Sequence, residues 1–133
     1  MISNNYANNL LKQMTGNMYL GLCSEEPNSN TGAVSSEPTS SYYARVPLSS
    51  TDFTTNGGVI TNSKELKFNT ARESFGTMKY FFVASNSTRG SVANWWGRLL
   101  DASGQPADVT IGENTVPVFY EGDLRASIDV PLT

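Results

Sequence analysis

Apolar and polar residues alternate along most of this chain in short runs, which is the two-residue period of a β-strand. Residues 18–23 place large apolar side chains at every second position and predict a half-buried strand. Residues 42–48 predict a second strand. Between them, residues 24–41 hold two Glu-Pro steps and a glycine among polar residues, which is typical of a long loop. Loops of this length are uncommon in compact domains unless they bind or move, so this one is a candidate contact surface, with plain flexibility as the alternative.

Further alternating runs follow at near-regular spacing, each bounded by turn residues. Residues 78–84 form the most hydrophobic run and predict a central strand covered on both faces. Residues 93–100 return as its partner, with Trp95 and Trp96 on opposite faces, one in the core and the other near the surface. Consecutive glycines at 57–58 permit the positive φ of a tight hairpin turn. The remaining predicted strands are residues 59–62, 65–68, 109–111, 115–120 and 123–130.

A short helix is predicted over residues 3–14, before the first strand. Ser3 or Asn4 can cap its N-terminus, and Gly16 ends it. A helix of about three turns is marginal alone, so it must pack on the rest of the domain or on a neighbouring subunit. If it serves assembly, a chain without residues 1–15 should still fold. The apolar positions that face this surface are Tyr6, Leu10, Leu11 and Met14.

One helix followed by roughly seven to nine short strands is typical of an antiparallel β-sandwich, with a partly closed β-barrel as the alternative. A length of 133 residues suits one domain. We therefore expect residues 1–16 to form the N-terminal helix, as a packing or interface element, and residues 17–133 to form a single β-sandwich domain. Pro117 cannot donate to a strand ladder, so its strand should be an edge or bulged.

Four short motifs occur in a characteristic order along the chain. They are residues 8–11 (NNLL), 19–22 (YLGL), 43–45 (YAR) and 75–76 (FG). In this order they resemble a family of small virion proteins of tailed bacteriophages, usually described as tail-fibre-like. Its members begin with a helix that contains an N-x-L-L motif. A YLGL segment, a YAR segment and a WG or FG dipeptide follow in that order, and a strand of aromatic and aliphatic residues comes next. The resemblance spans nearly the whole chain and implies a structural protein of the virion.

The composition fits such a protein. The net charge is −3 and only 16% of the residues are charged, so the chain lacks the electrostatic footprint of a nucleic-acid or lipid binder. The single cysteine, Cys23, falls in an apolar strand and is expected to pack in the core. No run reaches the roughly 18 apolar residues of a membrane span, and the N-terminus is unlike a signal peptide. We expect a protein made in the host cytoplasm and located in the virion.

The residue types argue against catalysis. The chain has no histidine, which removes the Ser-His-Asp and Cys-His arrangements and imidazole metal sites. What remains is carboxylates: Glu25 and Glu26 on the long loop, and Glu121 and Asp123 around a glycine. Either pair could ligate a hard cation or act in hydrolysis, but carboxylates so placed are usually just solvated. We expect no catalytic residues, no cofactor and no metal.

Aromatic residues occur as adjacent pairs, and neighbours in a strand point to opposite faces. The outward members can cover a second face of the same domain, bury a subunit interface or stack on sugar rings. Together with the helix they give the candidate interface: Tyr6, Leu10, Leu11, Met14, Tyr42, Tyr43, Trp95, Trp96, Phe119 and Tyr120.

We therefore expect a non-enzymatic bacteriophage protein that acts by assembly onto the particle. Its expected partners are other virion proteins of the capsid or tail, including further copies of itself as a homo-oligomer. The chain lacks the repeats or heptads of a fibre shaft, so decoration of the capsid or another virion surface stands beside a tail-fibre role. The alternative is a lectin-like module binding bacterial surface glycans for host attachment. A small hydrolase rests on the carboxylates alone.

Overall fold

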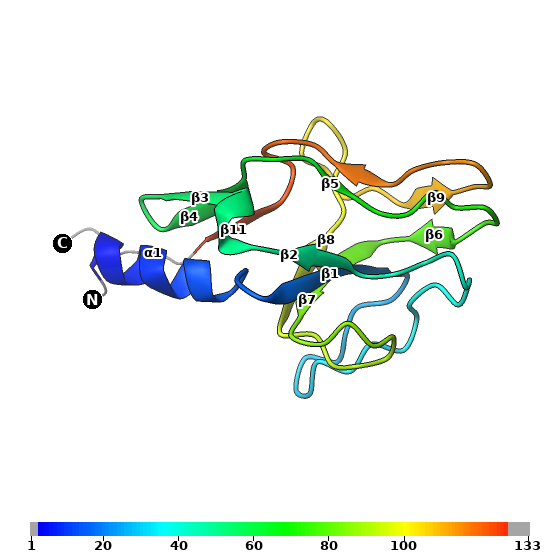
Figure 1. The fold of residues 1–133 in the computed structure, drawn as a ribbon, viewed down its shortest axis with the longest axis horizontal. Coiled ribbons are helices and arrows are strands. Elements are labelled where there is room, and N and C mark those ends of the chain that lie inside the picture. Colours follow the sequence, from blue (N-terminus) through cyan, green and yellow to red (C-terminus); the bar gives the residue numbers. More distant parts are fainter. Residues whose placement is uncertain (1–2, 128–133) are drawn as a thin grey trace.

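The computed structural model describes residues 3–127, in which one α-helix precedes eleven short strands (Figure 1). Residues 128–130, part of the last predicted strand, lie outside this range. The elements are α1 (Asn4–Gln13), β1 (Met18–Cys23), β2 (Val46–Leu48), a 3-10 turn at Ser50–Asp52, β3 (Phe53–Asn56), β4 (Val59–Asn62), β5 (Leu66–Lys67), β6 (Gly76–Met78), β7 (Tyr80–Ala84), β8 (Trp95–Arg98), β9 (Val109–Ile111), β10 (Val118–Phe119) and β11 (Arg125–Ser127).

The strands form the expected antiparallel β-sandwich. One layer is a four-stranded sheet in the order β2-β1-β7-β8. The facing layer consists of three smaller sheets, β11-β4-β3, β10-β5 and β6-β9, and all strand pairs are antiparallel. Between residues 3 and 127, none of these sheets closes on itself, so the barrel alternative is wrong. Figure 1 shows the four-stranded sheet in the middle, with the small sheets above it and two long loops below.

The four-stranded sheet is buried on both faces. In β1, Leu20 and Leu22 point into the main core between the layers, while Gly21 and Cys23 point to the opposite face. A Cβ atom at Gly21 would overlap the ring of Phe82 on the neighbouring strand β7, so only glycine fits there. The prediction of a half-buried first strand is therefore wrong, whereas the prediction of a central strand covered on both faces is confirmed for β7.

The outer face of this sheet is covered by the loop of residues 24–41, which we call the cover loop. Val34 from this loop packs with Ala93 against Cys23 and Phe82, forming a second apolar cluster. Cys23 is fully buried, as its place in an apolar strand predicted. The loop is long because it spans a whole sheet face.

Residues 78–84 do not form one continuous strand. The chain pairs with β9 up to Met78 and with β1 and β8 from Tyr80 onward. At the junction, the Lys79 amide donates to the Cys23 carbonyl at 3.0 Å. The chain thus passes from one layer to the other at Lys79, a change of sheet that hydrophobicity alone does not reveal.

The two tryptophans of β8 point to opposite faces of the sheet, as predicted, but they are buried to a similar degree. Both are half-buried: Trp95 packs against the main core and Trp96 against the second cluster. The Trp95 indole donates to the Met14 carbonyl at 3.1 Å, and the Trp96 indole to the Glu26 carboxylate at 3.3 Å. The prediction that one would be core and the other near the surface is wrong, because both sheet faces are covered.

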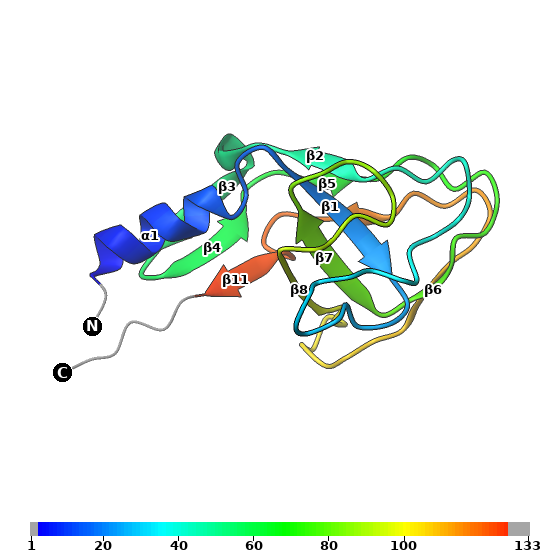
Figure 2. The same cartoon turned by 90° about the horizontal axis from the view of Figure 1, so that it is seen from below.

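The N-terminal helix is capped as predicted, with the Ser3 hydroxyl accepting from the Tyr6 amide. Its buried face differs from the prediction: Ala7 and Leu11 are fully buried, while Tyr6 is 57% exposed. The turn that ends the helix uses the left-handed φ of Asn17 rather than Gly16. Figure 2 shows α1 lying along the hairpin of β3 and β4.

Leu11 belongs to the main core, so α1 is part of the folded body. This burial argues against the expectation that a chain without residues 1–15 would keep its fold. The hairpin beside α1 is confirmed as predicted, since both Gly57 and Gly58 have positive φ and connect β3 to β4 in two residues.

Replacing Phe82 with alanine should lower the free energy of unfolding by about 3–5 kcal/mol, because its fully buried ring packs both on Gly21 and in the second cluster. Lys67→Ala is the control, since its side chain is exposed and forms only a surface ion pair with Glu65. It should change the free energy by less than about 0.5 kcal/mol. Urea unfolding followed by fluorescence measures both; equal effects would contradict the burial of β7 on both faces.

Candidate functional site

A groove of about 1270 Å³ opens beside β8 and is lined mostly by apolar side chains. Its walls include residues of β8, β9, β10 and β11, each of which is the last strand of its sheet within residues 3–127. The position of β10 at a sheet edge agrees with the prediction from Pro117. Four of the seven exposed large hydrophobic side chains in residues 3–127 line this one groove: Leu100, Val109, Val116 and Tyr120. Gathered exposed apolar side chains of this kind mark binding surfaces.

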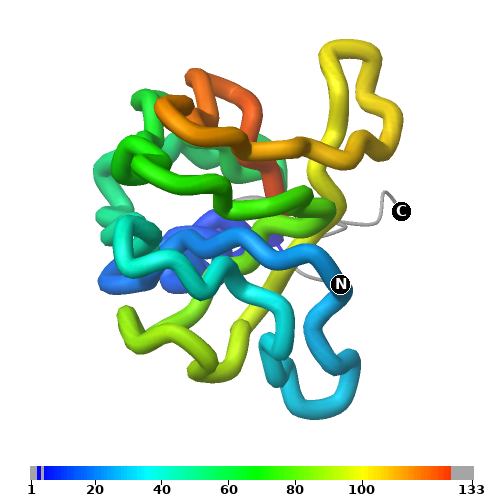
Figure 3. Tube along the Cα trace, turned by 90° about the vertical axis from the view of Figure 1, so that its right-hand side faces the viewer, coloured from blue at the N-terminus to red at the C-terminus, as the bar shows by residue number. Residues whose placement is uncertain are grey.

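A rigid hairpin borders the groove. Residues 99–107, which we call the hairpin loop, are closed at their base by the Ala107 amide, which donates to the Leu99 carbonyl at 2.9 Å. At the tip, the Asp101 carboxylate accepts from the Ser103 and Gln105 amides at 2.9 and 3.0 Å. The hydrogen bond from Gln105, with that from Ser103, lowers the pKa of Asp101 against a small opposing effect of desolvation. Figure 3 shows this loop, in yellow, standing away from the body.

The structure brings together only some of the predicted interface residues. Leu11 and Tyr43 are buried in the chain's own core, at 0% and 5% exposure. Tyr6 and Tyr42 are 57% and 47% exposed but do not line the groove, and Leu10 is half-buried. The predicted residues that do line the groove are Met14, Trp95, Trp96, Phe119 and Tyr120.

A buried ion pair beneath the cover loop was not predicted from the sequence. The guanidinium of Arg45 and the carboxylate of Glu37 meet fork to fork, at 2.8 Å from Nε to Oε2 and 2.9 Å from Nη2 to Oε1. Both side chains are almost completely buried, at 1% and 2% exposure. The same carboxylate accepts from the Tyr43 hydroxyl at 2.6 Å and from the Gly90 amide at 3.0 Å. The pair is therefore fully hydrogen-bonded, as a buried charge requires.

Arg45 also binds the turn that follows β7. Its Nη1 donates to the Asn86 carbonyl and to the Ser91 hydroxyl, both at 2.7 Å, and its Nη2 donates to the Ser91 carbonyl at 3.0 Å. The guanidinium lies 4.7 Å from the centre of the Phe82 ring. Arg45 thus joins the cover loop, the sheet and the 86–91 turn at one point.

The ionisation of these groups follows from their surroundings. Burial would raise the pKa of Glu37, but hydrogen bonds from Arg45, Tyr43 and the Gly90 amide, with the Arg45 charge, outweigh it and lower that pKa. Burial and the Glu37 charge raise the pKa of Tyr43 well above its usual value. Burial, again with the Glu37 charge, raises the pKa of Cys23 to about 12. Glu37 therefore remains ionised and Cys23 remains a thiol, which suits a structural network rather than acid–base or nucleophilic chemistry.

The signal for this network is the YAR motif, whose residues carry part of the family resemblance and are predicted to lie in a strand over residues 42–48. β2 in fact begins at Val46, because Tyr43 and Arg45 turn their side chains into the network below the sheet. An arginine next to a run of apolar positions needs a carboxylate partner if it is buried. Glu37 lies eight residues away, but only the path of the cover loop brings it there.

The carboxylate pairs considered from the sequence lie on the surface. Glu25 and Glu26 are exposed on the cover loop, and Glu121 is exposed in a turn where Asp123 accepts from the Tyr120 amide at 2.8 Å. In the described part of the chain, no three His, Cys, Asp or Glu side chains come together as metal ligands. No helix within residues 3–127 has the length and apolarity that crossing a membrane requires.

A family model described as Podophage GP4 fiber I protein gp80 matches residues 1–125. The match therefore includes the hairpin loop, the Glu37–Arg45 pair and every groove-lining residue except Ala126. No curated protein and no solved structure matches the chain.

Replacing Glu37 with glutamine should destabilise the fold by about 3–5 kcal/mol, because it leaves the Arg45 charge buried without a counterion. Glu65→Gln is the matched control, since it removes a carboxylate from an exposed pair with Lys67 and should cost less than about 1 kcal/mol. Because folding lowers the pKa of Glu37, its stabilising contribution is complete above the unfolded-state pKa of about 4.3 and is lost as the pH falls through the lower folded-state value.

Urea unfolding between neutral and acidic pH measures both parts of this prediction. The native protein should lose more stability on acidification than the Glu37→Gln variant, while the Glu65→Gln variant should follow the native protein. Parallel curves for the native protein and the Glu37→Gln variant would show that the carboxylate contributes nothing through its charge.

Proposed function

This chain belongs to the family described as Podophage GP4 fiber I protein gp80, a family of phage fibre structural proteins, and from that membership we propose that it acts by assembly with other virion proteins. The resemblance to tail-fibre-like virion proteins, carried by the order of four motifs, is thereby confirmed. We propose a place in the tail fibre rather than on the capsid surface, because the family is named for a fibre.

The groove is the observation that carries the assembly proposal. Its volume of about 1270 Å³ exceeds the roughly 300–1,000 Å³ typical of small-molecule pockets. Its exposed apolar side chains are mostly aliphatic, namely Leu100, Val109 and Val116. Of the aromatic side chains in the lining, Trp95, Trp96 and Phe119 are half-buried and only Tyr120 is exposed. Aliphatic side chains bury well against another protein, whereas stacking on a sugar ring needs exposed aromatic faces. The groove therefore favours a protein contact over the lectin-like alternative.

The described residues also favour a role without catalysis. Glu37 is the carboxylate most removed from water, and it is held by Arg45, Tyr43 and Gly90. A general acid needs a raised pKa, and the pKa of Glu37 is lowered instead. Glu121 and Asp123 are exposed to water in a turn.

We expect the protein to be present in purified phage particles and to be located at the tail. Immunogold electron microscopy with antibodies against this chain measures both. Label on the capsid surface would support decoration and contradict the tail location. Complete absence from particles separated from free protein on a density gradient would contradict a structural role in the virion.

We also expect the purified protein to leave peptidoglycan and capsular polysaccharide intact over long incubation, because among residues 3–127 the buried Glu37 has a lowered pKa, and Glu121 and Asp123 are exposed. The assay measures the release of reducing ends. Release that is lost in the Glu121→Gln or Asp123→Asn variant would identify a depolymerase instead. Tight binding to these glycans without cleavage would favour the lectin-like alternative.

A further inference from the structure

We propose that the groove and the hairpin loop together form the surface by which two copies of this chain pair, with the hairpin loop of each copy filling the groove of the other. This inference rests on the proposed role in assembly and names the surface and the partner. The groove walls, the loop and the charges around them support it independently.

The groove is bordered by strand edges that a partner would cover. Within the described residues, β8, β10 and β11 each have a neighbouring strand on one side only, and all three line the groove. Proteins normally blunt or cover such edges, because uncovered edges pair with other chains. Of the two edges of the four-stranded sheet, β2 carries an exposed proline, Pro47, whereas β8 carries Trp95 and Trp96 beside the groove. β8 is therefore the edge left open to a partner.

The hairpin loop is held in shape by its own hydrogen bonds rather than by burial. Residues 101–106 are all exposed, yet Asp101 fixes the tip through two amide hydrogen bonds, and a bridge between Leu100 and Pro106 closes the base. A loop that is ordered before binding loses less conformational entropy on association. Leu100, at 57% exposure, brings a large apolar side chain to the base of this loop.

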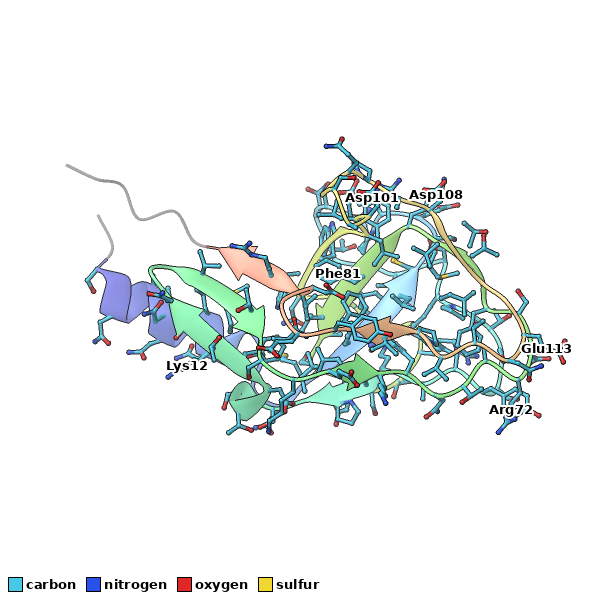
Figure 4. The ribbon with its side chains drawn as sticks, turned by 90° about the horizontal axis from the view of Figure 1, so that it is seen from above. Lys12, Arg72, Phe81, Asp101, Asp108 and Glu113 are labelled. Carbon is cyan, nitrogen blue, oxygen red and sulfur yellow. The ribbon has the colours of Figure 1, made fainter. Side chains whose placement is uncertain are left out.

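The groove and the hairpin loop lie side by side, which favours pairing of two copies about a two-fold axis. Leu100, Asp101 and Gly104 of the hairpin loop themselves line the groove. Figure 4 places Asp101 at one edge of the body, beside Asp108 and away from Lys12 on the helix. Because the loop and the groove are on the same face, two copies related by a two-fold axis can each insert the hairpin loop into the groove of the other.

The charges around the groove also fit a second copy. The lining contains two arginines, Arg98 and Arg125, and two aspartates, Asp101 and Asp123. These charges sum to zero, so the groove has no preference for a strongly acidic or basic partner. Arg98 is paired with Asp108 of its own chain at 2.9 Å. In a two-fold pair, Arg125 of each copy can lie opposite an aspartate of the other copy, which is the complementarity that a self-pairing surface needs.

The test is the self-association of the full chain, measured by sedimentation equilibrium over a range of concentrations. The native protein should form a dimer, and Leu100→Asp should weaken the dimer by roughly tenfold or more, because it puts a charge at the centre of the proposed contact. Val92→Asp is the matched control: Val92 is 52% exposed but does not line the groove, and its replacement should leave the dimer unchanged.

Val116→Asp provides a second groove variant, and thermal unfolding confirms that each variant folds. A native protein that stays monomeric at all concentrations would overturn the inference, as would equal weakening by Leu100→Asp and Val92→Asp. Particle incorporation separates this inference from the proposed function. A Leu100→Asp variant incorporated as well as the native protein would leave a structural role intact and remove the groove from assembly, whereas a native protein absent from particles would contradict the structural role itself.

Discussion

The buried pair of Glu37 and Arg45 is the interaction on which the arrangement of this fold depends. It joins the cover loop to the 86–91 turn across the outer face of the four-stranded sheet, with Phe82 directly beneath the guanidinium. Two buried charges are costly unless each is fully paired, and here Tyr43 and Gly90 complete the carboxylate's hydrogen bonds. Because the Arg45 side chain makes hydrogen bonds to both the cover loop and the 86–91 turn, it fixes the position of the cover loop on the sheet.

Covering both faces of the main sheet has a consequence for function. Within residues 3–127, the small sheets cover one face of the four-stranded sheet and the cover loop covers the other, so neither face of that sheet is left for a partner. The exposed apolar side chains gather at the sheet edges instead, around the groove beside β8. The groove is continuous with the core, because Leu22, Phe81 and Ile111 belong to the main core and also line the groove.

The motifs that identify the family mark positions that the fold requires. Tyr43 and Arg45 of the YAR motif build the buried network, and Gly21 of the YLGL motif allows the Phe82 ring to cross the neighbouring strand. Gly76 of the FG step has a φ of 90°, a conformation that L side chains rarely adopt. These motifs are therefore explained by the fold. They do not indicate what the groove binds.

The sequence by itself determined the fold class, the capped helix, the tight hairpin at Gly57–Gly58, the buried strand β7 and the family, because each follows from local periodicity, turn chemistry or motif order. Tertiary structure alone decided the rest. At Lys79 the chain passes from one layer to the other. Glu37 pairs with Arg45, and Leu100 and Val116 line the same groove, only because the fold brings separate segments together. Periodicity shows that a strand has a buried face, but which element covers that face is set by how the layers pack.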